Sequence, residues 1–420
     1  MIRRLLLLVV ALTILATTAP QSAAALTTSW QKELGVSLTS VAVGAHGSIY
    51  VAGSQANGKF QTKSFLAKLS PTGTVLWTRT WLPSNKINPA THTPWYSARA
   101  TAVAVATDGA IVVTGFVEKI NCEGGGWFIR KYGPSGKTLH SFGRFQKRRL
   151  QQCTLAPQST SAIAVRGNLV VVAGQDFGCC DDPASDGWVR AFDGRLRPRW
   201  EAPFEPPATI PQSWYDTAEG ISLGAGGNVY VGGWASTEPP ASGFDTFSGV
   251  GAVVLEKLDA TGSLAWSHTT GATMFRGSGP VSVSVRGDRA MVSAPVDGTG
   301  IRWTASQRTH AWLGRFTLDG ALVWSREWGL SKKHAAAPTG ISVDASMSTW
   351  VVGTQRDPTD HGLNVFVRRF GPGGKQLGQR SIGGGVSRTE GGGIAARAAA
   401  AYATGTTVAP STGRVWRVAA

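Results

Sequence analysis

Alternating apolar and small or polar residues fill most of this chain from about residue 37 onward. Val41–Gly53 and Val103–Gly115 are typical: one alternating stretch, a tight turn with Gly, and a second stretch ending in Gly. Alternation with period two predicts half-buried β-strands and disfavours helices. Further copies of this strand pair begin at Ile163, Ile221, Val283, Ile341 and, in degenerate form, Ile394.

A second pair of strands completes each repeat. A loop of variable length leads to a third strand with an aromatic or aliphatic start and a basic residue. The copies are Phe65–Leu69, Phe128–Tyr132, Trp188–Phe192, Val254–Leu258, Trp312–Phe316 and Phe366–Phe370. A turn with an early Pro or a late Gly then leads to a fourth strand, where Pro presets φ and Gly supplies a positive φ. The fourth strands carry Trp77, Leu139, Trp200, Trp266, Trp324 and Leu377, spaced 53 to 66 residues apart.

The two ends of the chain complement each other. Ser29–Leu34 has the pattern of a fourth strand but precedes the first full repeat, whereas Gly413–Val418 has the pattern of a third strand and no fourth strand follows it. We therefore expect an all-β fold, a β-propeller of seven four-stranded blades, with the N-terminal strand completing the C-terminal blade and removing open edges. The Ala-rich run Ala395–Ala403 could instead be helical, but the order of the unit predicts a strand pair there.

The unit resembles the repeat of bacterial secreted β-propellers known as the SBBP, or seven-bladed β-propeller, repeat. Gly340-Ile-Ser-Val-Asp344 is similar to the start of that repeat, and Gly227-Asn-Val-Tyr-Val-Gly-Gly233 to its second strand. Leu264-Ala-Trp266 and Leu322-Val-Trp324 loosely match its fourth strand. The resemblance covers nearly the whole chain after residue 25, except that blade seven is degenerate and several loops are long. It implies a propeller fold and export, and it implies no particular activity.

The first 25 residues have the pattern of a signal peptide. Arg3 and Arg4 precede the apolar stretch Leu5–Ala16, and Ser22–Ala25 offers small residues for cleavage. An uncleaved interfacial anchor is the alternative. No later stretch approaches the roughly 20 apolar residues of a membrane span. We expect residues 26–420 to form a single secreted or extracytoplasmic propeller domain.

The net charge of +16, which becomes +14 without Arg3 and Arg4, favours anionic partners. An anionic envelope polymer, a glycan or a protein are candidates, although we favour the interpretation that the charge is a general solubility feature. No Lys/Arg-rich recognition helix is present, so no specific nucleic-acid partner is expected. We expect a monomer without a cofactor.

All long connections fall at one end of the predicted ring, where loops on a rigid scaffold commonly bind ligands. Two aromatic pairs precede first strands there, and exposed rings of this kind can stack on sugars. Polar residues beside the rings could bind hydroxyl groups, although the rings could also pack under their own loops. The candidate ligand-binding residues are Trp95, Tyr96, Arg99, Trp214, Tyr215, Asp216 and Glu219.

The four cysteines fall in loops at the same end. An even number in an exported chain predicts two disulfides. Three connectivities are open, and we favour one in which Cys122 and Cys153 each bond one of Cys179 and Cys180. No paired CxxC spacing or nearby His indicates zinc, so we expect no metal site.

Catalytic motifs are absent from the sequence. No phosphate-binding Gly-rich loop and no Gly-x-Ser-x-Gly nucleophile elbow is present in a suitable context. The leading hypothesis is therefore a non-enzymatic binding module. A polysaccharide hydrolase or lyase with carboxylates at the channel mouth is the first alternative, and a protein-interaction scaffold without a small ligand is the second.

Overall fold

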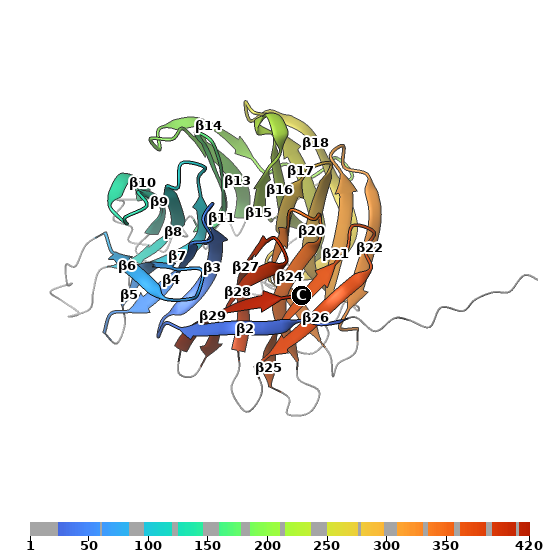
Figure 1. The fold of residues 1–420 in the computed structure, drawn as a ribbon. Coiled ribbons are helices and arrows are strands. Elements are labelled where there is room, and N and C mark those ends of the chain that lie inside the picture. The colour runs from blue at the N-terminus through green and yellow to red at the C-terminus, as the bar shows by residue number, and fades with distance from the viewer. Residues whose placement is uncertain are drawn as a thin grey trace, which may run out of the picture.

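The computed structural model describes residues 24–58, 61–83, 96–119, 125–145, 159–177, 185–210, 215–236, 250–275, 279–297, 309–330, 335–356, 362–383, 389–408 and 411–420. They form seven sheets, each with four antiparallel strands and one with a further short strand, that follow one another around a central axis in chain order. Figure 1 shows this arrangement. The prediction of an all-β, seven-bladed propeller is confirmed.

Each of the first four blades is a run of four consecutive strands. Blade 1 contains β3 (Ser37–Val43), β4 (Ile49–Ala56), β5 (Thr62–Leu69) and β6 (Val75–Trp81). Blade 2 contains β7 (Tyr96–Val105), β8 (Ile111–Lys119), β9 (Gly125–Tyr132) and β10 (Thr138–Phe145). Blade 3 contains β11 (Ser159–Arg166), β12 (Leu169–Phe177), β13 (Ser185–Phe192) and β14 (Pro198–Pro203). Blade 4 contains β15 (Asp216–Leu223), β16 (Val229–Ser236), β17 (Val250–Leu258) and β18 (Leu264–Phe275), with a short 3₁₀ turn η1 (Ala225–Gly227) between β15 and β16.

The last three blades continue this order. Blade 5 contains β19 (Ser282–Arg286), β20 (Arg289–Asp297), β21 (Thr309–Thr317) and β22 (Leu322–Trp328). Blade 6 contains β23 (Ala336–Val343), β24 (Thr349–Arg356), β25 (Leu363–Phe370) and β26 (Gln376–Ile382). Blade 7 contains β27 (Thr389–Arg397), β28 (Ala400–Val408), β29 (Ser411–Ala419) and, from the other end of the chain, β2 (Thr27–Glu33).

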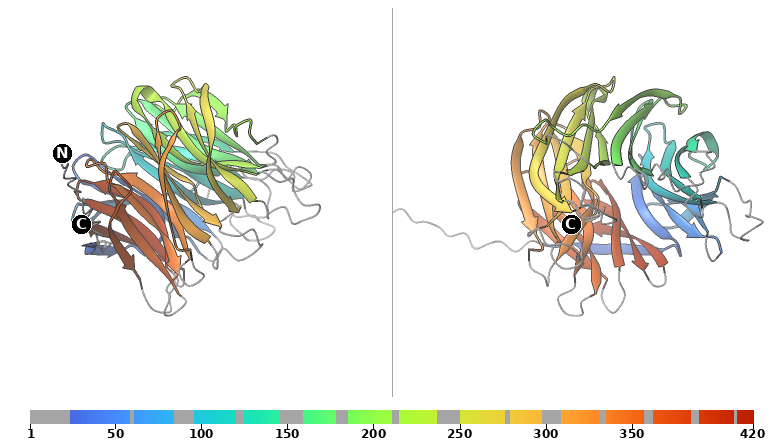
Figure 2. Two further views of the ribbon diagram at one scale, coloured as in Figure 1. Left: turned by 90° about the vertical axis from the view of Figure 1, so that its right-hand side faces the viewer. Right: turned by 180° about the vertical axis from the view of Figure 1, so that it is seen from behind.

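Strands from the two ends of the chain lie side by side in blade 7. β2 pairs antiparallel with β29, so blue and red ribbons lie side by side (Figure 1 and Figure 2). In this pairing Trp30 lies opposite Arg417. A further two-residue strand, β1 (Ala24–Ala25), pairs in parallel with β26 and gives blade 6 a fifth strand that the sequence did not indicate. The Ala-rich run forms the end of β27 and the start of β28, joined by a turn in which Ala398 has a φ of 52°.

The first strand of every blade is innermost, and neighbouring first strands contact one another around the whole ring. Between the blades lie buried apolar clusters. One of them joins Val171 and Val189 of blade 3 to Val231 and Val254 of blade 4. Burial of such apolar surface at each interface is the main force that holds the ring together.

Several tryptophans of the fourth strands connect neighbouring blades through hydrogen bonds. The indole N–H of Trp77 donates to the carbonyl of Pro134, 3.2 Å away in the turn of the next blade. Trp200 and Trp324 make the same bond to the following turn, and Trp30 makes it from blade 7 to Pro71 of blade 1. The second residue of each of these turns therefore sets the backbone conformation and also supplies the carbonyl that accepts the indole N–H.

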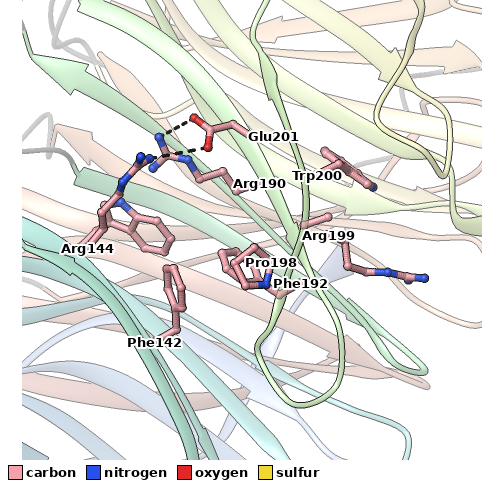
Figure 3. A pocket seen from close by; sticks show the side chains of 10 residues that line it. Phe142, Arg144, Arg190, Phe192, Pro198, Arg199, Trp200 and Glu201 are labelled. Carbon is pink, nitrogen blue, oxygen red and sulfur yellow. Dashed lines mark hydrogen bonds and ion pairs between the residues drawn. The ribbon is translucent and has the colours of Figure 1, made fainter.

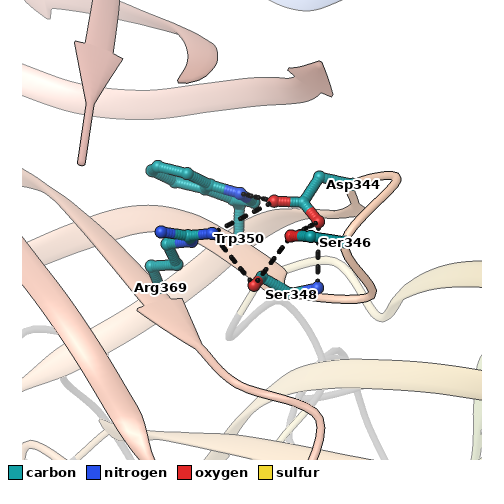
Figure 4. Close-up of polar contacts among 5 residues, drawn as sticks. All are labelled: Asp344, Ser346, Ser348, Trp350 and Arg369. Carbon is teal, nitrogen blue, oxygen red and sulfur yellow. Dashed lines mark hydrogen bonds and ion pairs between the residues drawn. The ribbon is translucent and has the colours of Figure 1, made fainter. Parts of the chain in front are cut away.

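Blade 6 contains a buried polar network around Asp344 (Figure 4). The Asp344 carboxylate accepts hydrogen bonds from Ser348 N and Ser346 Oγ within its own turn. Its second oxygen accepts the indole N–H of Trp350 at 2.9 Å and lies 3.7 Å from Nη2 of Arg369. One fully buried carboxylate thus fixes the β23–β24 turn, the core tryptophan Trp350 and Arg369 of β25.

In the part of the chain that the structure describes, no helix has the length and hydropathy that a membrane crossing requires. All four cysteines lie outside the described residues, so the predicted disulfides stay a prediction.

Candidate functional site

The candidate ligand-binding residues fall into three groups. Trp95 and Trp214 lie outside the described residues. Tyr96 begins β7 and is half-buried, and Arg99 on the same strand is exposed. Tyr215, Asp216 and Glu219 lie at or beside the start of β15.

Two of these residues are buried and do not offer the solvent-facing surface that the sequence suggested. Tyr215 is 4% exposed and packs with Trp234 in the apolar cluster between blades 4 and 5. Asp216 is buried against blade 3, where its Oδ1 accepts a hydrogen bond from Gly187 N at 2.5 Å. The polar and aromatic character of these positions did not reveal which side of the strand they would occupy.

Bulges near the start of the innermost strands shape the mouth of the central channel. In β3 the pairing with β4 skips one residue between Leu38 and Ser40, so Thr39 bulges from the strand. The same irregularity places Thr101, Ser161, Glu219 and Thr339 at the bulges of β7, β11, β15 and β23. Extra residues of this kind re-aim side chains at the rim of a closed sheet.

The bulged side chains form bonds to the next blade. Thr39 Oγ1 donates to the carbonyl of Ala100 at 2.9 Å, and Thr339 Oγ1 donates to the carbonyl of Gly392 at 2.7 Å. Glu219 Oε2 accepts the backbone N–H of Val281 at 2.7 Å. Each hydroxyl keeps acceptor capacity after donating its proton, so the rim holds pre-positioned polar atoms.

A cavity of about 450 Å³ lies at this end of the channel. Its walls come from the starts of β3, β23 and β27, from the end of β28 and from the segment before β19. The lining residues are Ser37, Leu38, Thr39, Pro280, Thr339, Glu390, Gly391, Gly392 and Thr406. The cavity therefore combines hydroxyl groups, a carboxylate and backbone without side chains, and its volume is in the range typical of small-ligand sites.

Glu219 borders the same region, because the residue that bonds it, Val281, follows Pro280 in the cavity wall. Burial raises the pKa of the Glu219 carboxyl to about 7, although hydrogen bonds from Val281 N and Thr217 Oγ1 favour its ionised form. A carboxyl group with a pKa near neutrality can give or take a proton at physiological pH.

A second group of buried acids lies between blades 3 and 4, away from the cavity. Glu256 on β17 is fully buried, and burial raises its pKa to about 8. Its Oε2 accepts the backbone N–H of Glu205 at 3.2 Å. Burial likewise raises the pKa of Asp216 to about 7, with a smaller contribution from the nearby charge of Asp186. These carboxyl groups are enclosed by the blade interface and do not reach the channel mouth.

Sequence reasoning missed Glu256, although a signal was present. Glu256 occupies the third-strand position at which the equivalent copies have Arg130, Arg190 and Arg368, and in each case this residue pairs with the second-strand valine of its own blade. An acid in place of a recurrent arginine marks a blade interface with a different electrostatic character. The residues of the channel-mouth cavity carried no such signal, since small and polar residues are also typical of turns.

No group of three or more His, Cys, Asp or Glu side chains within the described ranges is arranged to hold a metal ion.

No family model matches the sequence, and no curated protein matches it. Among solved structures, a PL25 ulvan lyase bound to a GlcA–Rha3S saccharide is similar in fold, with a TM-score of 0.53 and 11% identity over 92% of this chain and 96% of that chain. A sialidase from Trypanosoma rangeli gives a TM-score of 0.47 at 9% identity, covering 93% of this chain. The β-propeller domain of the trilobed protease from Pyrococcus furiosus gives 0.45 at 9% identity, over 92% of this chain and 94% of that domain. The chain spans 60% of the sialidase and about half (49%) of an acylaminoacyl peptidase from Pyrococcus horikoshii.

At these identities the likeness shows a shared propeller fold alone. The resemblance to the secreted SBBP repeat stays a prediction.

Proposed function

We propose that this protein is an exported propeller that binds a glycan at its channel mouth without chemically changing it. The observation that carries the proposal is the cavity of about 450 Å³ on the innermost strands. Sugars present many hydroxyl groups, and the Ser37 hydroxyl and the Glu390 carboxylate in the cavity wall are acceptors for them. The Thr406 hydroxyl and the Gly392 carbonyl already accept from Leu38 N and Thr339 Oγ1, and each oxygen keeps a second lone pair.

Two features of the sequence support this function. The pattern of residues 1–25 is that of a signal peptide, which would bring the protein into contact with envelope polymers. The net charge of +16 would attract acidic polymers to the propeller before the cavity engages them.

A binding screen with purified protein tests the proposal. Glycans and cell-wall polymers are titrated at low and high salt against the wild type and a Ser37→Phe variant, in which a bulky ring fills the cavity. Ser135→Phe is the matched control, because Ser135 is exposed in the turn between β9 and β10 at the opposite end of the ring. We expect salt-resistant binding that Ser37→Phe abolishes and Ser135→Phe retains. Binding that is equal in both variants, or that vanishes in salt, would place the ligand elsewhere or reduce it to charge attraction.

A polysaccharide hydrolase or lyase is the second candidate, and the pKa of Glu219 near 7 is the observation that favours it. Asp216, the other candidate carboxylate of β15, is buried against blade 3, so Glu219 is the residue to test. In an enzyme, Glu219→Gln should abolish cleavage of any glycan found in the screen while binding persists. In a binding module, no cleavage occurs in the wild type and the variant differs only in affinity. A protein that binds no glycan would instead fit the protein-interaction scaffold.

A further inference from the structure

Third-strand arginines recur on the outer part of the blade interfaces, where each one stacks on a ring of the preceding blade. The guanidinium of Arg130 lies 4.9 Å from the ring centroid of Trp81. The equivalent distances are 5.2 Å from Arg190 to Trp127 and 5.0 Å from Arg368 to Trp328. Stacking of this kind stabilises a partly buried cation but does not neutralise its charge.

In blade 3 the carboxylate of Glu201 neutralises the positive charge of Arg190 (Figure 3). Arg190 Nη2 donates to Glu201 Oε1 at 2.8 Å, and Arg144 Nη1 lies 3.7 Å from Glu201 Oε2. Glu201 is directly opposite Arg190 in the pairing of β13 with β14. This position of the blade can therefore accommodate a carboxylate in contact with the third-strand arginine.

Blade 6 has the same arginine without the carboxylate. The residue opposite Arg368 in the pairing of β25 with β26 is Gln379, which stands where blade 3 has Glu201. Among the residues that the structure describes, the hydrogen-bond acceptor for Arg368 is the neutral Gln376, whose Oε1 is 2.9 Å from Nη1. Burial lowers the pKa of Arg368 to about 10, and no acidic group within the described part of the chain offsets this effect.

The space beside Arg368 is open. A groove of about 420 Å³ runs between blades 5 and 6, with the aromatic rings of Trp328 and Phe370 and the turn Gly373–Gly374 in its walls. Of the described residues that line it, Arg326, Arg368 and Lys375 are cationic and Glu327 is acidic. Glu327 is itself 3.4 Å from Nε2 of His310.

We infer that the groove between blades 5 and 6 binds a carboxylate carried on a ring, such as a uronate, with the carboxylate on Arg368. The intramolecular pair of Arg190 with Glu201 shows the contact that the ligand would reproduce. Arginine is suited to this contact because its planar donors match the two oxygens of a carboxylate. The walls formed by Trp328 and Phe370 offer apolar surface to the face of a ring.

Titration calorimetry with glucuronate, glucose and acetate as probes tests this inference in the mature protein. Glucuronate supplies both the ring and the carboxylate, whereas glucose and acetate each supply one. We expect glucuronate to bind at least about tenfold more tightly than either, because a charge-assisted hydrogen bond adds to the ring contact. Glucose binding as tight as that of glucuronate would overturn the role of the carboxylate, and failure of glucuronate to bind would overturn the site.

Gln379→Glu is the decisive variant, since it places an intramolecular carboxylate opposite Arg368 in the register that Glu201 has in blade 3. It should abolish glucuronate binding while the protein stays folded. Gln355→Glu adds the same charge near the other end of blade 6, on β24, and should leave binding unchanged. Arg368→Gln should also abolish binding, but Gln379→Glu decides the question if that variant is unstable. Unchanged binding in Gln379→Glu would refute the site. Gln379 and Arg368 do not line the channel-mouth cavity on which the proposed function depends, so the two proposals can fail separately.

Discussion

The carbonyl oxygen of Ser37 occupies the space into which a Cβ atom on Gly53 would project. Gly53 lies on β4 opposite Leu38, the residue that precedes the bulge at Thr39. The equivalent glycine lies opposite the bulge in blades 2, 3, 4, 6 and 7, and a Cβ there would meet the equivalent carbonyl; these glycines are Gly115, Gly174, Gly233, Gly353 and Gly405. Blade 5 has Ala294 instead, and the pairing of β19 with β20 shows no irregularity. The bulge thus requires a glycine on the neighbouring strand, because it brings a carbonyl oxygen into the space that a Cβ atom would occupy.

Gly53→Ala should therefore destabilise the propeller by about 2–3 kcal/mol, because either the bulge or the β3–β4 pairing must shift. The free energy of unfolding in urea measures the effect. Gly373→Ala is the matched control, since a Cβ at that position has no atom within 4 Å and its φ is not positive. Equal stability of Gly53→Ala and Gly373→Ala would show that the strand tolerates the methyl group.

The fold could be predicted because the same four-strand pattern recurs in every repeat. Alternation gave the strands, and the recurrence of a fourth-strand Trp or Leu, from Trp30 to Leu377, gave the number of blades. Repetition of this kind averages out a degenerate copy such as the one that begins at Ile394.

The candidate site could be predicted only in its position at the channel mouth. The bulges are invisible in the alternation pattern, since one inserted residue reverses which side chains face inward. Tyr215 and Asp216 are consecutive and face opposite sides of the sheet, and both are buried because a neighbouring blade covers each side, blade 5 over Tyr215 and blade 3 over Asp216. The contrast between Glu201 and Gln379 was equally hidden, because it has meaning only once the strand register is known.

Three carboxyl groups make the stability depend on pH. The folded protein holds the proton of Glu256 up to about pH 8, whereas the unfolded chain releases it near 4.5. The folded state thus binds more protons between these values, so the free energy of unfolding falls as the pH rises through this window. Asp216 and Glu219 act in the same direction up to about pH 7. Each group contributes at most about 1.4 kcal/mol per pH unit.

Glu256→Gln should remove the part of this decline that extends from pH 7 to 8. The charged groups that face Glu256 are Asp216 from β15 and Glu205 after β14, and both disfavour its ionisation. Melting temperatures from pH 5 to 9 measure the slope for the variant and the wild type. Glu118→Gln, on β8 of blade 2, is the control that should keep the wild-type slope. A variant with the same decline above pH 7 as the wild type would show that Glu256 is not the group that titrates there.

Removal of residues 26–36 should lower the melting temperature, because it takes β2 from blade 7 and exposes the edge of β29. It also removes Leu26, which is 1% exposed and packs between blades 6 and 7. Trp30→Phe is a milder change that keeps a ring beside Tyr402 but loses the hydrogen bond to Pro71, and should cost about 1 kcal/mol. A truncated protein that melts with the wild type would show that the pairing of β2 with β29 does not stabilise the ring.

The buried carboxylate of Asp344 should be among the most sensitive positions in blade 6. Asp344→Ala leaves the indole N–H of Trp350 without its acceptor and the Arg369 guanidinium without its counter-charge. Breaking a buried pair by removing one partner costs about 3–5 kcal/mol. Asp344→Asn should cost less, because an amide oxygen can still accept from Trp350 or from Ser348 N.

Ser346→Ala tests the contribution of the β23–β24 turn alone, without the contacts to Trp350 and Arg369. It removes the hydroxyl that donates to Asp344 Oδ1 but leaves Trp350 and Arg369 paired, so its cost should stay near 1 kcal/mol. Urea unfolding of Asp344→Ala, Asp344→Asn and Ser346→Ala measures how much free energy of unfolding each variant loses. If Ser346→Ala were as damaging as Asp344→Ala, the carboxylate would act mainly by closing the β23–β24 turn. A larger loss of stability in Asp344→Ala than in Ser346→Ala would instead show that the contacts of the carboxylate with Trp350 and Arg369 dominate.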